Sequence, residues 1–90
     1  MSTATYKVGT TFKVVAYVNY SCGEDAQIHV GDGLEIIKKK FKLEPRCEGA
    51  KGNLIYTVLA KSPCVTSAWK EFTYSNRPKQ TDYIKVYVVA

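Results

Sequence analysis

Residues 11–20 read TFKVVAYVNY, and this stretch decides the fold class. Its residues alternate, so that one face of an extended chain would carry Phe12, Val14, Ala16 and Val18, and the other Lys13, Val15, Tyr17 and Asn19. A period of two is the pattern of a strand with one buried face. We therefore predict a β-strand over residues 11–20.

Three further stretches carry strand signals. Residues 34–43 alternate, residues 54–60 are almost wholly apolar, and residues 83–89 alternate again. These stretches are rich in β-branched and aromatic residues, which fit a pleated, half-buried surface. The sequence therefore predicts a strand in each of them.

Residues 64–74 leave two alternatives open. Val65, Trp69 and Phe72 are spaced as on one face of a helix, whereas alternate residues such as Phe72 and Tyr74 also suit a strand. We expect a short helical turn over residues 67–71 that runs into a short strand.

The predicted elements indicate an all-β chain. About five short strands favour a strongly bent sheet that closes into a small barrel, because closure removes exposed sheet edges. The length of 90 residues fits a single domain over residues 1–90, with residues 1–5 flexible. Trp69, the only tryptophan, is expected to plug one end of the barrel.

The amino-acid composition indicates what kind of partner the protein binds and where it works. The net charge of +5 and the pI near 9.2 favour an anionic partner, such as nucleic acid or an acidic protein face. Three cysteines without a CxxC pair argue against a disulfide framework and a zinc site. The absence of an apolar run of about 18 residues and of a secretory signal predicts a cytoplasmic protein with no membrane contact.

Residues 19–33 are expected to form a long loop, because glycine and aspartate punctuate them. The only histidine, His29, lies in it near Glu24, Asp25 and Asp32. Such groups do acid–base chemistry only in a pocket, and the sequence has no nucleophile motif, phosphate-binding loop or metal-ligand spacing. We therefore expect a non-enzymatic protein with no catalytic residue, no metal and no cofactor.

Two segments support a family resemblance. Residues 6–15 read YKVGTTFKVV and residues 30–38 read VGDGLEIIK. Both resemble the V-G-D opening of strands in SH3-like small barrels, including the KOW and Tudor-like groups, although Thr10 replaces the aspartate in the first copy. They also resemble small accessory proteins of tailed bacteriophages. The resemblance covers residues 6–60 and implies an SH3-like barrel, but it assigns no functional residue.

Two groups of residues are candidates for binding. The basic group has an aromatic residue within it, and lysine with aromatic faces suits phosphates and bases; its members are Lys38, Lys39, Lys40, Phe41, Lys42 and Arg46. On a strand, however, Lys39 would point away from its two neighbours, and the group could simply be a solvated strand end that discourages edge pairing. The aromatic group is an expected outward surface of Tyr17, Tyr83 and Tyr87, which could equally be cross-strand pairs.

Two functions follow from these features. The first is a protein-binding module, such as a phage accessory protein that binds and inhibits a host factor in the host cytoplasm during host takeover or anti-defence. The alternative is a nucleic-acid-binding small barrel that uses the basic, aromatic-interleaved surface. The oligomeric state cannot be read from the sequence.

Overall fold

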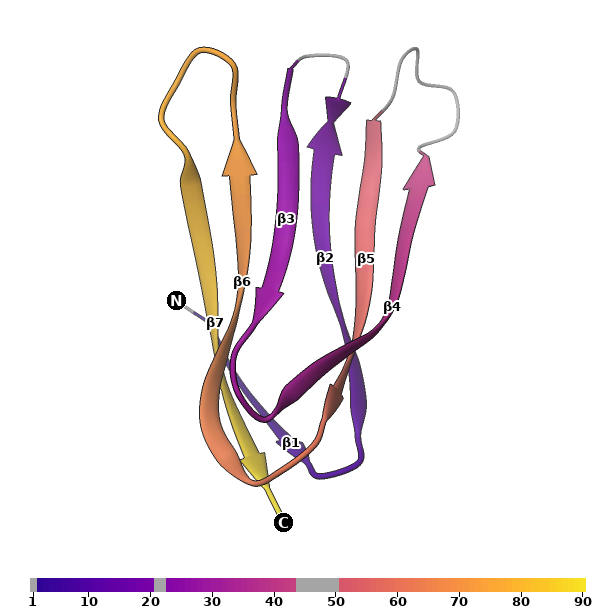
Figure 1. The fold of residues 1–90 in the computed structure, drawn as a ribbon, viewed down its shortest axis with the longest axis vertical. Helices are drawn as coiled ribbons and strands as arrows, with labels where there is room; N and C mark the ends of the chain where they lie inside the picture. The colour runs from indigo at the N-terminus through magenta and orange to yellow at the C-terminus, as the bar shows by residue number, and fades with distance from the viewer. Residues whose placement is uncertain (1, 21–22, 44–50) are drawn as a thin grey trace.

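The structure, a computed structural model, describes residues 2–20, 23–43 and 51–90 (Figure 1). They form seven strands, which are β1 (Ser2–Lys7), β2 (Thr11–Asn19), β3 (Asp25–Val30), β4 (Leu34–Leu43), β5 (Lys51–Ala60), β6 (Cys64–Thr73) and β7 (Gln80–Val89). The all-β class predicted from the sequence is confirmed, and the described residues contain no α-helix.

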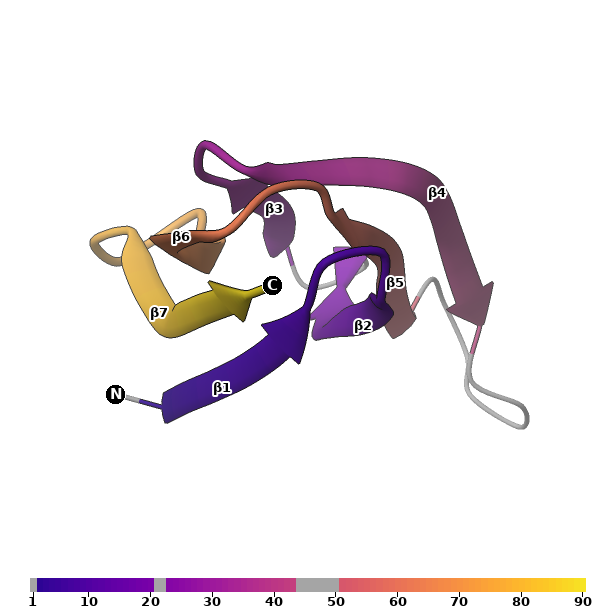
Figure 2. The ribbon, with the colours of Figure 1, turned by 90° about the horizontal axis from the view of Figure 1, so that it is seen from below.

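The strands form two sheets, which Figure 2 shows from below. Sheet A has the order β1-β7-β6-β3 and sheet B the order β2-β5-β4. All neighbours are antiparallel except β1 and β7, which run parallel. One sheet thus contains β2, β4 and β5, and the other contains β3, β6 and β7. This is the arrangement of strands in an immunoglobulin-type β-sandwich.

The core lies between the inward faces of the two sheets, as the alternation of residues 11–20 predicted. Small and β-branched side chains dominate it, and its buried members are Val14, Ala16, Val18, Ala26, Ile28, Leu34, Val58, Ala60, Ala68, Val86 and Val88. Short side chains on facing strands allow two sheets to approach closely. The Tyr6 ring on β1 stacks on the Phe12 ring on β2, with centroids 4.1 Å apart, and so joins the two sheets at one side.

The structure corrects the predicted barrel. It has seven strands rather than about five, and they form two sheets rather than a closed SH3-like barrel. The helical turn expected over residues 67–71 is wrong, because these residues lie within β6 and pair with both β3 and β7. The helix-like spacing of Val65, Trp69 and Phe72 spreads them over both faces of that strand.

The first residues of the chain and the segment expected to be a long loop also differ from expectation. Residues 2–5, expected to be flexible, pair in parallel with residues 84–87 of β7. The loop expected over residues 19–33 contains β3, on which Ala26 and Ile28 point into the core. In this segment the glycines and aspartates mark the ends of a short strand, not one long connection.

One end of the sandwich, here called the base, holds the connections β1–β2, β3–β4 and β5–β6 (Figure 1). Backbone hydrogen bonds tie these connections to neighbouring strands and to one another. Two bonds reach neighbouring strands, from the Val8 N–H to the Val89 carbonyl and from the Gly31 N–H to the Ser67 carbonyl. Three more join the connections, from Gly9 to Ala60, from Ala60 to Thr10 and from Lys61 to Gly33, and all five are 2.8–3.0 Å long. Backbone groups make these bonds, and the Cys64 thiol adds a side-chain bond to the carbonyl of Asp32 over 3.6 Å.

Candidate functional site

The opposite end of the sandwich, here called the loop end, holds the β2–β3 and β6–β7 turns. Strand direction alone places them together, since β2 and β6 run toward this end and β3 and β7 run away from it (Figure 1). β4 ends here and β5 begins here as well. Among the described residues, the loop end comprises Tyr20, Gly23, Glu24 and residues 74–79.

The β2–β3 turn is tight and local. The N–H of Gly23 donates to the carbonyl of Tyr20, and the N–H of Glu24 donates to the carbonyl of Asn19, each over 3.3 Å. Gly23 has a φ of 75°, a conformation that glycine adopts without steric cost. A Cβ added there would stand 2.8 Å from the Oγ of Ser75, so the two turns of the loop end are in contact.

The β6–β7 turn is organised around an aromatic ring. The guanidinium of Arg77 lies over the Tyr74 ring, 3.9 Å from its centroid, and the Tyr74 hydroxyl donates to Oε1 of Gln80 over 3.5 Å. Below the turn, Nζ of Lys79 lies 3.6 Å from Oε2 of Glu71. The cation–π contact holds Arg77 against the tip of the turn, where its charge faces solvent.

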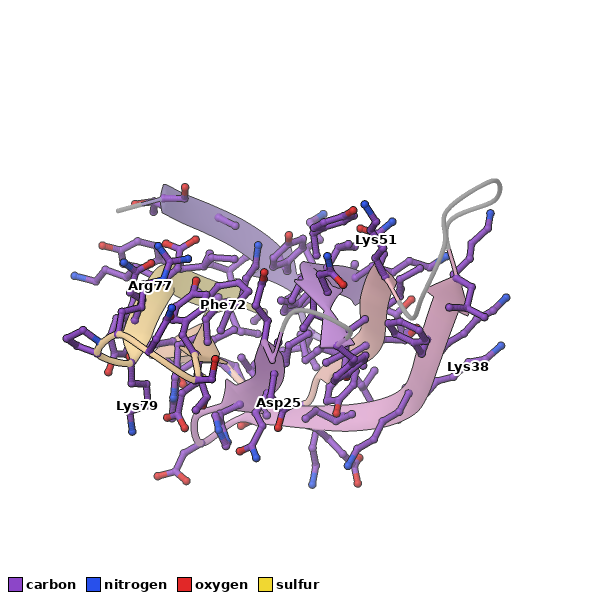
Figure 3. The ribbon with its side chains drawn as sticks, turned by 90° about the horizontal axis from the view of Figure 1, so that it is seen from above. Asp25, Lys38, Lys51, Phe72, Arg77 and Lys79 are labelled. Carbon is purple, nitrogen blue, oxygen red and sulfur yellow. The ribbon has the colours of Figure 1, made fainter. Side chains whose placement is uncertain are left out.

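A shallow hollow lies where the two turns meet. It is lined by Glu24 from one turn and by Tyr74, Ser75, Asn76 and Arg77 from the other. Figure 3, which looks onto this end, labels Arg77 at the β6–β7 side. The hollow thus offers a carboxylate, a guanidinium, an aromatic ring and small polar groups, which suit hydrogen bonding to a partner's backbone and side chains.

Tyr20 is part of the loop end, and its ring meets the Phe41 ring edge-on with centroids 5.3 Å apart. Partial burial raises the pKa of the Tyr20 hydroxyl above its ordinary value, and the negative charge of Asp25 and the neighbouring Tyr56 act in the same direction. Tyr20 therefore keeps its proton, and with it a hydrogen-bond donor, to a higher pH than a free tyrosine does.

The predicted basic group is divided between two faces of β4. Lys38, Lys40 and Lys42 point outward from sheet B, where they line a groove together with Lys13. Lys39 points the other way, and its Nζ lies 5.4 Å from the centroid of the Tyr56 ring. Phe41 also lies on the inner side, packed against the core rather than interleaved with the lysines. Arg46 lies outside the described residues.

The predicted tyrosine surface is wrong as a single surface. Tyr17 is 49% exposed on the outer face of sheet B, whereas Tyr83 is 48% exposed on the outer face of sheet A. Tyr87, also on sheet A, is half-buried, with Nζ of Lys85 5.4 Å from its ring centroid. The binding role of each tyrosine stays a prediction.

The positions of Trp69 and His29 differ from two further expectations. Trp69 is on the outer face of sheet A, half-buried between His29 and Tyr83, with ring centroids 5.5 and 5.7 Å away, and it plugs no barrel end. His29 is on β3 rather than in a loop, and its ring stacks on the indole of Trp69. Among the described residues, no three histidine, cysteine, aspartate or glutamate side chains gather in a way that could hold a metal ion.

Sequence reasoning missed the residues of the loop end. The segment 75–80 is readable as a polar turn, but only the strand directions place it beside Gly23. It also missed that Lys13 joins the lysines of β4, because these two strands meet only through β5. A local signal was available in the spacing of Tyr74 and Arg77, which are three residues apart in this polar segment.

The fold and its loop end define a class, a small immunoglobulin-type β-sandwich with one polar, loop-built end. No model of a protein family matches the chain, and no curated protein matches it. Among solved structures, it is similar to the cysteine protease inhibitor EhICP2 of Entamoeba histolytica, with a TM-score of 0.81 at 14% identity, over 98% of this chain and 86% of that one. It is also similar to amebosin, with a TM-score of 0.73 at 16% identity, over 97% and 88% of the two chains.

These likenesses confirm a small all-β fold of the kind found in those two proteins. They offer no support for the SH3-like or phage resemblance. The described part of the chain contains no helix long and apolar enough to cross a membrane.

Proposed function

We propose that the chain is a non-enzymatic, protein-binding inhibitor whose target is a cysteine protease, and that it binds this target with the loop end. The observation that carries the proposal is the contact between Gly23 and Ser75, which joins the β2–β3 and β6–β7 turns into one surface. The fold likeness to a cysteine protease inhibitor over 98% of the chain supports the choice of target.

The architecture suits this role for a physical reason. In immunoglobulin-type sandwiches, the loops between the second and third strands and between the sixth and seventh lie at one end and form binding surfaces on a rigid scaffold. The loop end matches those two positions. The hollow at this end is shallow and open, which suits contact with a partner's surface better than enclosure of a substrate.

The side chains of the loop end have the composition of an interface. Tyrosine and arginine are enriched among residues that dominate binding energy, and Tyr74 and Arg77 stand here already stacked on one another. Because the pair is held before binding, less side-chain entropy is lost on association. Glu24 adds a carboxylate across the hollow, so the surface can pair with both charges.

The proposal agrees with the binding module expected from the sequence but not with its setting. A phage accessory role and a host factor as the target find no support in the two similar structures. Nucleic-acid binding, the alternative expected from the sequence, would use a different surface, the outer face of sheet B.

The test is inhibition of papain-type cysteine proteases by the purified chain, followed with a fluorogenic peptide substrate, with a serine protease as the specificity control. We expect tight inhibition of at least one cysteine protease and none of the serine protease. Arg77→Ala and Tyr74→Ala should each weaken inhibition about tenfold or more, the range of a residue that dominates an interface. Lys61→Ala removes an exposed cation at the base and should leave inhibition unchanged.

Two results would contradict the proposal. The first is no inhibition across a panel of cysteine proteases by a chain shown to be folded. The second is inhibition that Arg77→Ala and Lys61→Ala weaken equally, since this would place the contact elsewhere than the loop end.

A further inference from the structure

The net charge of the protein is concentrated on one of its two sheets. The strands of sheet B carry six lysines and one glutamate, Lys13, Glu35, Lys38, Lys39, Lys40, Lys42 and Lys51. The strands of sheet A carry three lysines and three carboxylates, Lys7, Asp25, Lys70, Glu71, Asp82 and Lys85. The net charge of +5 of the whole chain therefore equals that of sheet B alone.

Four of these lysines surround a groove on the outer face of sheet B. The groove is lined by Lys13 from β2, by Lys38, Lys40 and Lys42 from β4, and by Ile55 and Thr57 from β5. In the sheet register, Lys13 stands across Thr57 from Lys38, and Val15 stands across Ile55 from Lys40. The shorter side chains of β5 form the floor, and the lysines rise at both sides, about 10 Å apart, which is two strand spacings.

An aromatic residue follows the groove residues in the sheet register. Tyr17, 49% exposed, stands across Asn53 from Lys42 in the register. The lysines of β4 follow at every second residue, about 7 Å apart. The one carboxylate of this outer face among the described strand residues, Glu35, lies at the far end of β4, beyond the register shift between Ile36 and Lys38.

We propose that this groove binds single-stranded nucleic acid, as an activity separate from the loop end. A row of evenly spaced cations matches a polymer that carries one negative charge on every unit, and this attraction is not specific for sequence. The Tyr17 ring and the aliphatic floor offer contacts to base faces, which are accessible in a single strand and covered by stacking in a duplex. The expected ligand is therefore a short single strand of any sequence.

The chain provides a matched control on the same strand. Lys39 lies between Lys38 and Lys40 but points to the inner side, over the Tyr56 ring. A Lys39→Ala variant and a Lys40→Ala variant thus remove the same charge from adjacent positions, and only the second removes it from the groove. Overall charge and pI change equally in the two variants.

The experiment is fluorescence anisotropy of a short labelled oligo-dT with the purified chain, at salt concentrations between about 50 and 200 mM. Four neutralised phosphates predict a slope of log affinity against log salt of about −3, since each contributes about 0.7 for a single strand. Lys40→Ala should weaken binding and reduce the slope by about 0.7, whereas Lys39→Ala should do neither. Tyr17→Leu should weaken binding and leave the slope unchanged.

Three outcomes would overturn the proposal. One is no binding of oligo-dT at the lowest salt concentration. This holds also if the protein instead binds vesicles that contain phosphatidylserine. Another is an equal loss in the Lys39→Ala and Lys40→Ala variants. The third is tighter binding of a duplex of the same length. Protease inhibition by the Lys40→Ala variant reports separately on the loop end and should equal that of the unchanged protein.

Discussion

Gly23 and Ser75 stand so close that a Cβ on the glycine would lie 2.8 Å from the serine Oγ. The two residues are 52 positions apart; Gly23 lies in the turn that connects sheet B to sheet A, and Ser75 lies in a turn within sheet A. Gly23 also has a φ of 75°, so its lack of a side chain serves both the backbone conformation and the contact. The shape of the loop end therefore depends on this one glycine.

Replacing Gly23 by alanine tests that dependence. The left-handed backbone should cost about 1–2 kcal/mol of unfolding free energy, and the contact with Ser75 should add to this cost. Gly9→Ala is the matched control, because Gly9 has a φ of 90° but nothing within 4 Å of an added Cβ. Urea unfolding should show a larger loss for Gly23→Ala, and only that variant should inhibit protease less well. Equal effects of the two variants on inhibition would show that the turns do not act as one surface.

Tyr20 predicts a pH dependence of stability. The pKa of Tyr20 in the folded chain is raised above the ordinary value of 10.0, which holds in the unfolded chain. At a pH between these two pKa values, the folded chain keeps the tyrosine proton and the unfolded chain has lost it. The stabilising contribution is therefore complete below pH 10 and is lost as the pH rises through the folded-state pKa. Denaturant melts at increasing alkaline pH should show a shallower loss for Tyr20→Phe, which keeps the Phe41 contact, than for the unchanged protein. Asp25→Asn should give an intermediate slope, and a steeper loss in Tyr20→Phe would contradict the assignment.

The Tyr6–Phe12 stack predicts an energetic coupling between the sheets. The rings are 4.1 Å apart with 4° between their planes, and they join β1 of sheet A to β2 of sheet B. A double-mutant cycle with leucine at both positions should give a coupling of about 0.5–1.5 kcal/mol in unfolding free energy. The same cycle between Tyr6 and the distant Tyr83 should be additive. An uncoupled Tyr6–Phe12 pair would mean that the parallel pairing of β1 with β7 alone holds the first strand.

Local patterns predicted much of the fold. The alternation in residues 11–20 and 34–43 gave β2 and β4 almost to the residue, because each strand has one buried face. β1 was missed because Ser2–Thr5 contains no large apolar side chain, and its half-buried position there is filled by the small Ala4. β3 was missed because the glycines and aspartates around it suggested one long loop, although Ala26 and Ile28 alternate as strand residues do.

The candidate site was less predictable for a physical reason. The direction in which Lys38, Lys39 and Lys40 point follows from the period of a strand, and this expectation agrees with the structure. Which residues from other strands stand beside them depends on sheet order, to which no local pattern in the sequence points. The same holds for the loop end, where the turn at 75–80 could be predicted but its contact with Gly23 could not.

The hydrogen-bonded base has a consequence for how such a sequence can evolve. Main-chain groups hold the three connections there, and apart from Gly9 and Gly33, which have φ angles of 90° and 86°, these bonds do not depend on the identity of a side chain. Mutations can therefore accumulate in the other side chains of the base with little harm to folding, while selection acts on the turns that meet a partner. The solved structure that shares this fold at a TM-score of 0.81 is only 14% identical to the chain.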